Sequence, residues 1–407
     1  MVYFLYLIFI SLSLDSLFKI PLGDFNVHIS HILLIAFFAL YSQRLTYLSS
    51  FVRDNKFLFM LFCIITIDFI RALELGVFFK VYIYFVVALL LFYFIYSVID
   101  KVANFHFATL SILSLYLVLF GGFVQYILLY QGDTQLLLAG IQEGYYENGG
   151  SIGERLRGFF LEPNWFGLSL YFSFLACFLF YRMGEYTRAS FIITAFLSFS
   201  ALYLSGNRLI MFLLILLICG NFIGSVIKSK KNIYRLVFIL FTSILVIYLY
   251  LILSGNEYIL QDRSISARSN TLVSSFLYLT NIGELKELIF GMGFSNWGTL
   301  SNQALLSSYN YLGEQGLAQR DTAELQVFLL ENGLLSLFLI LLDAYFISKS
   351  AATNCVMRET AYISIFGVCS LIFIGVFYPI YTFMMYLPFY FIIRTIALKG
   401  EGYDKRY

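Results

Sequence analysis

Charged side chains are scarce in this sequence. Aspartate, glutamate, lysine and arginine make up 12% of its 407 residues, whereas hydrophobic residues make up 60%. Soluble domains carry about 25% charged residues, so the composition excludes an ordinary water-soluble protein. Apolar runs of about 17–25 residues recur from end to end, and each is long enough to cross a bilayer as a helix. We therefore expect a single polytopic membrane domain over residues 1–407, with no nucleic-acid partner.

Cysteine is also sparse, and its spacing does not fit a metal site. Four of the five cysteines lie inside apolar runs, and the fifth, Cys355, lies in a short polar loop. Since none has zinc-ligand spacing, we expect no disulfide, no metal site and no cofactor. Residues 1–14 lack the basic segment and the small-residue cleavage site of a signal peptide, so we expect them to form a retained first span.

The apolar runs predict an all-α protein with about twelve transmembrane helices. They lie near residues 1–14, 28–43, 57–73, 77–98, 107–130, 165–181, 189–204, 209–227, 236–254, 325–347, 360–378 and 380–398. Most of the lysines and arginines fall on one side if both termini are cytoplasmic, and KSKKNIYR at 228–235 contributes most to that bias. Because basic residues favour the cytoplasmic side, the bias predicts cytoplasmic termini.

Two long polar loops then face the opposite, extracytoplasmic side. They cover residues 131–164 and 255–322. The second loop contains two helix-like stretches, near 266–280 and 283–290, and the first of these has apolar residues at helical spacing. Loops of this length in a compact protein usually have a function. We therefore expect the second loop to lie over an active site.

The first loop ends in RLRGFFLEPNW, residues 155–165, directly before an apolar run. Pro163 suits the first turn of a helix. Arg155, Arg157 and Glu162 would then lie at the outer mouth of the helical bundle. They can be read as interfacial side chains with a local Arg–Glu pair, or as an anion site, since the guanidinium group matches phosphate oxygens in a bidentate manner.

Further arginines recur on the same side. The very short turn SGNR, 205–208, brings Arg208 to membrane depth, where an ionisable side chain needs a partner or a function. Arg263 and Arg268 lie at the front of the first helix-like stretch of the second loop, and a helix N-terminus already favours anions. Their recurrence predicts a site for a negatively charged ligand.

Two more segments border the last group of spans. Arg320, Asp321 and Glu324 gather before the span at 325–347, and a helix would bring the two acids to one face. They are either an ordinary acidic helix start or a general base for a hydroxyl acceptor. GMGFSNWG, 291–298, is glycine-rich; turn formation explains it better than ligand binding.

Four motifs occur in a fixed order along the chain. They are R-x-x-G-x-F-x-x-P-N at 155–164, S-G-N-R at 205–208, F-G-M-G-F at 290–294 and L-Q-V-F-L-L-E-N-G at 325–333. In this order, and with this spacing to the spans, they resemble the O-antigen polymerase/O-antigen ligase superfamily. The resemblance covers about residues 150–345 by motif and the whole chain by its number of spans.

The resemblance implies a GT-C-like helical architecture in the bacterial inner membrane. It implies metal-independent glycosyl transfer at the periplasmic face, from an undecaprenyl-diphosphate-linked sugar. Its implied partners are such lipid-linked oligosaccharides, membrane lipids and, as a further candidate, a chain-length-regulating co-polymerase. Carried over to this chain, the arginines that would hold the diphosphate are Arg155, Arg208 and Arg268, with Arg157, Arg263 and Arg320 as neighbours.

One departure from the family pattern matters. Ligases of this superfamily typically carry a histidine in an H-N-x-x-L-Q pattern, where this chain reads DTAELQ at 321–326. The missing histidine favours a repeat-unit polymerase and leaves Asp321, Glu324 and Glu162 as candidate bases. A ligase-type glycosyltransferase and a lipid-linked oligosaccharide flippase remain alternatives. A flippase would more often show inverted repeats and broken spans, and the sequence indicates neither.

Overall fold

The structure is a computed structural model, and it describes most of the helical part of the chain. The described residues are 2–13, 19–22, 25–41, 47–130, 156, 163–226, 229–253, 279–280, 284–297, 300, 324–375 and 386–401.

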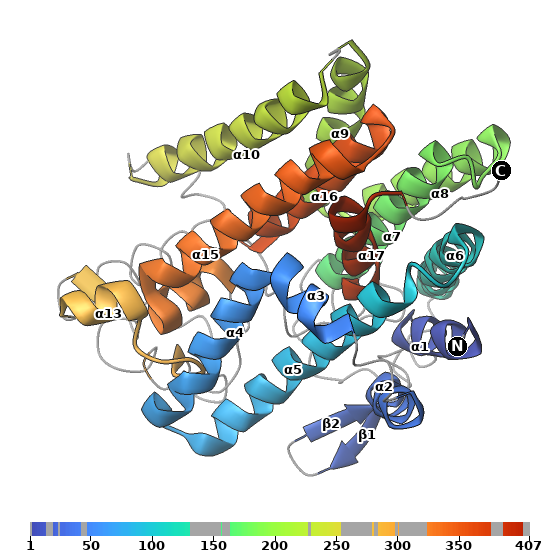
Figure 1. The fold of residues 1–407 in the computed structure, drawn as a ribbon. Coiled ribbons are helices and arrows are strands. Elements are labelled where there is room, and N and C mark those ends of the chain that lie inside the picture. Colours follow the sequence, from blue (N-terminus) through green and yellow to red (C-terminus); the bar gives the residue numbers. More distant parts are fainter. Residues whose placement is uncertain are drawn as a thin grey trace.

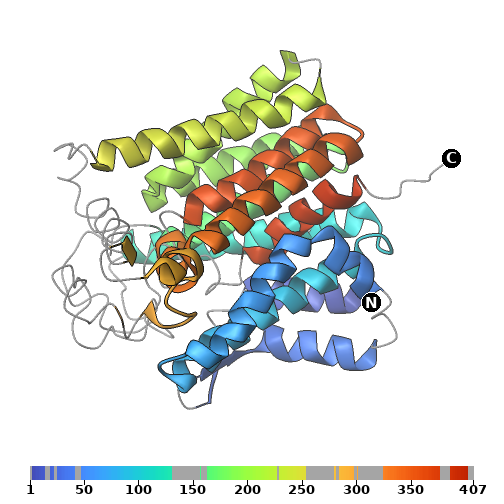
Figure 2. The same ribbon diagram turned by 60° about the vertical axis from the view of Figure 1, so that its left-hand side comes forward.

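Helices dominate these residues. The first half contains α1 (Val2–Ser13), α2 (Ile29–Leu40), α3 (Leu48–Asp54), α4 (Lys56–Ile67), the short 3-10 helix η2 (Asp68–Arg71), α5 (Leu75–Val98) and α6 (Asn104–Tyr130). The second half contains α7 (Pro163–Arg182), α8 (Arg188–Ser205), α9 (Arg208–Val226), α10 (Lys230–Leu253), α13 (Leu285–Phe290), α15 (Glu324–Asn354), α16 (Arg358–Gly375) and α17 (Leu387–Lys399). Figures 1 and 2 show these helices gathered into one bundle.

Each of the twelve predicted spans coincides with a helix, but only some of these helices are long and apolar enough to cross a membrane. In the described part, six helices are long and apolar enough to cross a membrane: α5, α6, α7, α8, α15 and α16. Four shorter apolar helices accompany them, among them α1 and α2. A helix of 12 residues such as α1 or α2 rises about 18 Å, less than the hydrocarbon core of about 30 Å. Several long apolar helices in one chain indicate a multi-pass membrane protein.

The described part of the chain is helical, as predicted, apart from one short hairpin that the sequence did not predict. Residues Lys19–Leu22 (β1) and Phe25–His28 (β2) pair as an antiparallel hairpin, with Lys19 opposite His28 and Leu22 opposite Phe25. Nearly all of these residues lie between the predicted spans 1–14 and 28–43. Gly-Asp between two short runs of alternating apolar residues is typical of a tight hairpin turn, so the local pattern was present but was hidden by the neighbouring apolar runs.

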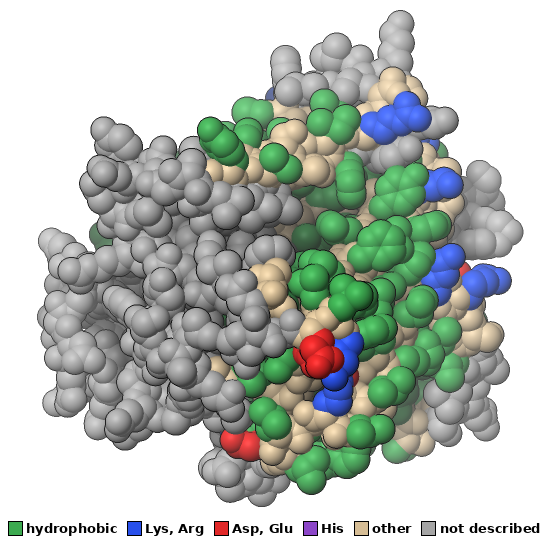
Figure 3. Space-filling model, turned by 90° about the vertical axis from the view of Figure 1, so that its left-hand side faces the viewer, with side chains coloured by type: hydrophobic (Ala, Val, Ile, Leu, Met, Phe, Trp, Pro, Cys, Tyr) green, Lys and Arg blue, Asp and Glu red, His purple; other side chains and the backbone are tan. Residues whose placement is uncertain are grey.

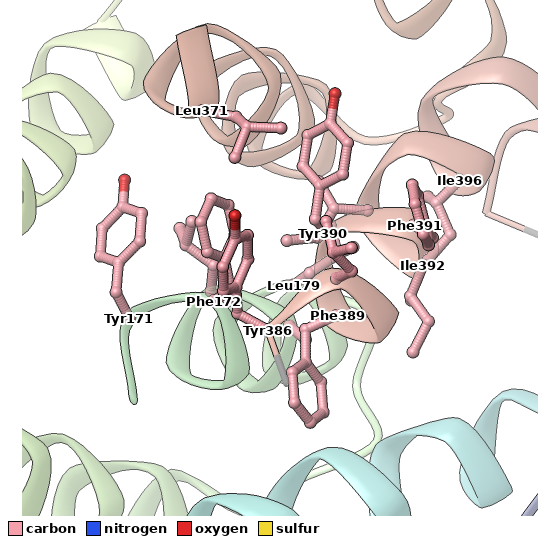
Figure 4. Packing of buried hydrophobic residues seen from close by; sticks show 14 of the residues in the cluster. Tyr171, Phe172, Leu179, Leu371, Tyr386, Phe389, Tyr390, Phe391, Ile392 and Ile396 are labelled. Atoms are coloured by element: carbon pink, nitrogen blue, oxygen red, sulfur yellow. The ribbon is translucent and has the colours of Figure 1, made fainter. Parts of the chain in front are cut away.

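The centre of the bundle is formed by α7, α16 and α17, although α7 lies far from the other two in the sequence. Figure 4 shows side chains from these helices packed together. The ring of Phe172 in α7 stacks on Tyr386, with 5.4 Å between centroids, and meets Tyr390 of α17 edge-on at 5.9 Å. Such aromatic pairs add specific packing to a membrane bundle.

A buried charged cluster joins three elements near the centre. The guanidinium group of Arg394 in α17 is 3% exposed and donates two hydrogen bonds to the Asp343 carboxylate of α15, at 2.6 and 2.9 Å. It also donates to the side-chain oxygen of Asn55, between α3 and α4, at 2.9 and 3.2 Å. Ionisable residues within a membrane domain are costly unless paired. This pairing therefore fixes α17 against α15 and the α3–α4 junction.

The surface of the bundle is largely apolar. Figure 3 shows one face, where hydrophobic side chains cover much of the described surface and lysine and arginine side chains gather along one margin. An apolar belt of this kind suits contact with lipid tails.

Candidate functional site

The SGNR turn is as short as the sequence predicts. α8 ends at Ser205 and α9 begins at Arg208. Between them, Gly206 adopts φ 62°, the left-handed conformation that glycine accepts without steric cost. The turn therefore reverses the chain within two residues and leaves Arg208 on the first turn of α9.

Asn207 connects this turn to α7. Its side-chain oxygen accepts a hydrogen bond from the backbone N–H of Ile210 at 3.2 Å, which caps α9. Its amide nitrogen donates to the backbone oxygen of Asn164, in the first turn of α7, at 3.5 Å. A Cβ atom added to Gly167 would lie 2.6 Å from that nitrogen. Glycine at 167 thus permits the close approach, and the start of α7 is held against the α8–α9 turn.

Leu156 brings the RLRGFFLEPNW motif to the same place. Its backbone N–H donates to the Leu204 oxygen, in the last turn of α8, at 3.2 Å. Its side chain is buried beside α6 and α7: a Cβ added to Gly122 would lie 3.2 Å from Leu156 and 3.0 Å from Phe166. Two motifs that are about fifty residues apart therefore meet at one end of the bundle.

Arg208 is the one predicted arginine whose side chain the structure describes. It is exposed and lies at the N-terminal end of α9, while Pro163 begins α7 close by, as predicted. Two helix N-termini and a guanidinium group thus lie at one junction, and all three favour an anion. This arrangement is compatible with the predicted anion site, which stays a prediction.

The side chains of the other predicted site residues lie outside the described part of the chain. Glu324 is the first residue of α15, and its side chain lies outside the described residues, as do the whole of Glu162, Asp321, Arg155, Arg157, Arg263, Arg268 and Arg320. Of the two helix-like stretches in the second loop, 283–290 is confirmed by α13, and 266–280 falls almost entirely outside the described residues.

A second polar arrangement lies where α15 is interrupted. Gly333 adopts φ 65° and ψ −168° inside α15 and breaks its hydrogen-bond ladder. The carbonyl groups freed by this break accept hydrogen bonds from another segment. The Leu330 backbone oxygen accepts from the Met292 N–H at 2.9 Å, and the Glu331 backbone oxygen accepts from the Gly293 N–H at 2.8 Å. The segments FGMGF and LLENG therefore pair through their backbones.

Only glycine fits at the two closest positions. A Cβ atom on Gly291 would lie 2.3 Å from the Asn332 backbone nitrogen, and one on Gly333 would lie 2.4 Å from the Ile289 oxygen. Both residues also have positive φ angles. The expectation that GMGFSNWG forms a turn is confirmed, but the reason is its contact with α15, which no local pattern reveals.

Asp68 and Arg71 fasten this turn to the end of α4. The Arg71 guanidinium donates to the backbone oxygens of Gly291 at 2.8 Å and Phe290 at 3.1 Å. The Asp68 carboxylate accepts from Arg71 Nε at 2.9 Å and from the Phe294 N–H at 3.1 Å. Asp68 is 2% exposed, so its charge is matched by an arginine and a backbone donor, as burial requires.

The sequence did not predict that polar side chains gather at the break in α15. Glu331 is fully buried, and its carboxylate accepts from the Trp297 N–H at 3.0 Å. Asn296 donates to the backbone oxygens of Arg71 and Met292, both at 2.9 Å. The available signal was Glu-Asn-Gly inside an apolar run, since glycine there weakens a helix and polar residues there need partners. One expectation is corrected: at least one span, α15, is broken.

The described residues thus contain two polar junctions, one at the starts of α7 and α9 and one at the break in α15. Among these residues, no three histidine, cysteine, aspartate or glutamate side chains lie close enough together to hold a metal ion. Comparison of the chain with protein-family models, with curated proteins and with solved structures finds no match.

Proposed function

We propose that this chain is a polysaccharide (O-antigen) repeat-unit polymerase of the bacterial inner membrane. It transfers an undecaprenyl-diphosphate-linked glycan chain onto a hydroxyl group of a second lipid-linked repeat unit, at the periplasmic face. The observation that carries the proposal is the junction at the starts of α7 and α9, where Leu156, Asn207 and Arg208 bring two arginine-containing motifs together.

The chemistry requires positive charge at this junction. The acceptor oxygen attacks the anomeric carbon of the donor, the bond from that carbon to the diphosphate oxygen breaks, and the acceptor proton passes to a carboxylate. Negative charge grows on the leaving diphosphate, and fixed cations lower the energy of that transition state. Arg208 and the two helix N-termini supply such charge, and Arg155, Arg157, Arg263, Arg268 and Arg320 are the further candidates.

The proton acceptor is one of three carboxylates: Asp321, Glu324 or Glu162. Glu324 begins the short first half of α15, which ends at the break at Gly333. Because the FGMGF segment and Arg71 hold that break, they also orient the half-helix that starts with Glu324. The second polar junction therefore has a positioning role in this proposal.

A flippase for lipid-linked oligosaccharides is the second candidate, and a specific observation favours it. Transporters often contain interrupted membrane helices at their substrate sites, and α15 is interrupted. A ligase-type glycosyltransferase differs from the polymerase only in its acceptor.

The first experiment uses purified protein and undecaprenyl-diphosphate-linked repeat units, with EDTA present. The proposal expects a ladder of longer lipid-linked oligosaccharides. An intact substrate without a ladder would reject the polymerase. Adding lipid A–core would then test the ligase, and measuring movement of intact substrate across vesicle membranes would test the flippase.

A further inference from the structure

A groove of about 540 Å³ opens between α2, α3, α4 and α5. α5 contacts both sides of the groove: Phe38 of α2 stacks on Tyr93 at 5.8 Å, and Phe62 of α4 stacks on Phe85 at 6.1 Å between ring centroids. α3 borders the groove as well, and its Phe51 meets Tyr93 at 5.2 Å. We call this the α2–α5 groove. It does not include any part of the two polar junctions described above.

The α2–α5 groove is apolar and open to the surroundings of the bundle. At its rim, Ile35 is 61% exposed and Leu48 is 47% exposed. Among its lining side chains only Asn55 and the Tyr93 hydroxyl are polar, and the Asn55 oxygen already accepts from Arg394. In a membrane, hydrocarbon fills such a space at no cost, whereas water would leave apolar surface hydrated. The hydrocarbon that a membrane supplies to such a space is a lipid chain.

A cation lies near the α3 side of the groove. Tyr47 directly precedes Leu48 of the rim, and the Lys101 ammonium group lies 4.3 Å from the centre of the Tyr47 ring. Lys101 is exposed, and within the described part of the chain it makes no ion pair. The neighbouring Lys399 differs, because its ammonium group already pairs with Asp100. Lys101 can therefore bind an anion beside the α3 side of the groove.

We propose that the α2–α5 groove binds one acyl chain of an anionic phospholipid, whose phosphate lies against Lys101. An apolar groove with a basic residue beside its α3 side is the complement of a lipid with a negatively charged headgroup. Lys101 also belongs to the side that the Lys/Arg bias predicts to be cytoplasmic. The proposed lipid is therefore an inner-leaflet phospholipid, and the inference is independent of the polymerase proposal.

The test is photo-crosslinking in phosphatidylcholine nanodiscs that contain a trace of phosphatidylglycerol with a diazirine on its acyl chain. Crosslinks should concentrate on peptides from α2, α3, α4 and α5. Unlabelled phosphatidylglycerol should compete better than phosphatidylcholine by about fivefold, the factor that one basic residue near an anionic surface contributes. Crosslinks spread evenly over the lipid-facing helices, or equal competition by the two lipids, would overturn the proposal.

Two pairs of variants locate the binding. Ala39→Trp fills the groove and should abolish crosslinking there, while Leu40→Trp, on the next residue but outside the groove, should not. Leu48→Trp is a second filling variant in case Ala39→Trp does not fold. Lys101→Gln should remove the preference for phosphatidylglycerol, and Lys349→Gln, an exposed lysine on α15, should keep it.

One further outcome identifies a different occupant. If undecaprenyl phosphate displaces the label more strongly than phosphatidylglycerol does, the groove binds a polyprenyl chain and the phospholipid assignment is wrong. An unchanged crosslinking pattern in both filling variants would equally reject the groove as the binding place.

Discussion

At the scale of single residues, position in the structure decides what a side chain can do. Arg208 and Arg188 are both exposed arginines at helix starts, but only Arg208 lies beside the start of α7 and the Leu156 contact. Arg188 is the first residue of α8, and the turn with Arg208 follows the last residue of α8. The pair therefore offers a variant and a control of the same chemistry.

Arg208→Ala should lower the rate of chain extension by about 10²–10³-fold, the loss typical when one group that stabilises the transition state is removed. Arg208→Lys should restore only part of it, because an ammonium group cannot bind phosphate in a bidentate manner. Ladder formation by purified protein is the measurement, with Arg188→Ala as the control. Polymer of normal length from Arg208→Ala would reject the diphosphate role.

Cys355 shows how burial sets reactivity in the loop between α15 and α16. Burial raises the pKa of its thiol to about 12. The thiolate is the reactive form, so Cys355 should resist maleimide at pH 8 in the folded protein and react once the protein is unfolded in SDS. The adjacent Val356 is 74% exposed, so Val356→Cys in a Cys355→Ala background should react in both conditions.

The same pKa shift has a consequence for stability. The Cys355 thiol stays neutral in the folded protein but ionises in the unfolded chain near pH 8.5. Its contribution to the free energy of unfolding is therefore complete below that pH and is lost as the pH rises toward about 12. Fast labelling of native Cys355 at pH 8 would contradict both statements.

At the scale of elements, the break in α15 is produced by specific residues. It depends on two glycines, 291 and 333, whose missing side chains let two backbones pair. It also depends on Asp68 and Arg71, which reach the turn from the end of α4. A break held from two sides can position the half-helix that begins at Glu324.

Gly333→Ala should destabilise this element. The new Cβ would lie 2.4 Å from the Ile289 oxygen, and the positive φ angle alone costs about 1–3 kcal/mol for a residue other than glycine. The expected result is a lower melting temperature in detergent and loss of ladder formation. Gly76→Ala is the matched control, because a Cβ there meets nothing within 4 Å. Equal melting temperatures for the two variants would contradict the account.

At the scale of the whole molecule, the C-terminal helices hold the bundle together. α17 lies against α7 and α15, and its Arg394 reaches both Asp343 and the α3–α4 junction. Arg394 and Asp343 thus form an ion pair within the second half of the chain, and the Asn55 side chain connects that pair to the first half by hydrogen bonds.

Arg394→Ala should therefore destabilise the whole bundle, by about 3–5 kcal/mol, since it leaves the largely buried Asp343 carboxylate without its cation. Arg394→Met combined with Asp343→Leu should recover most of the loss, because an apolar pair of similar size needs no counter-charge. Melting temperatures and monodispersity in detergent give the answer. A double variant as unstable as Arg394→Ala would point to a role of the charges beyond packing.

The sequence by itself determined the membrane character and the position of almost every helix, because apolar runs and their polar ends report directly on a bilayer. It also predicted the short turn at 205–208 and the helix start at Pro163. Only the tertiary structure decided which motifs meet. Asn207 on Gly167, Leu156 on Leu204 and Gly291 on Gly333 are contacts between distant segments. The first and the third of these contacts need glycine at the point of closest approach, because a side chain would fill the space. The hairpin at 19–28 and the break in α15 each had a local signal that the neighbouring apolar runs hid, whereas the partner of Arg394 depends only on what lies opposite in space.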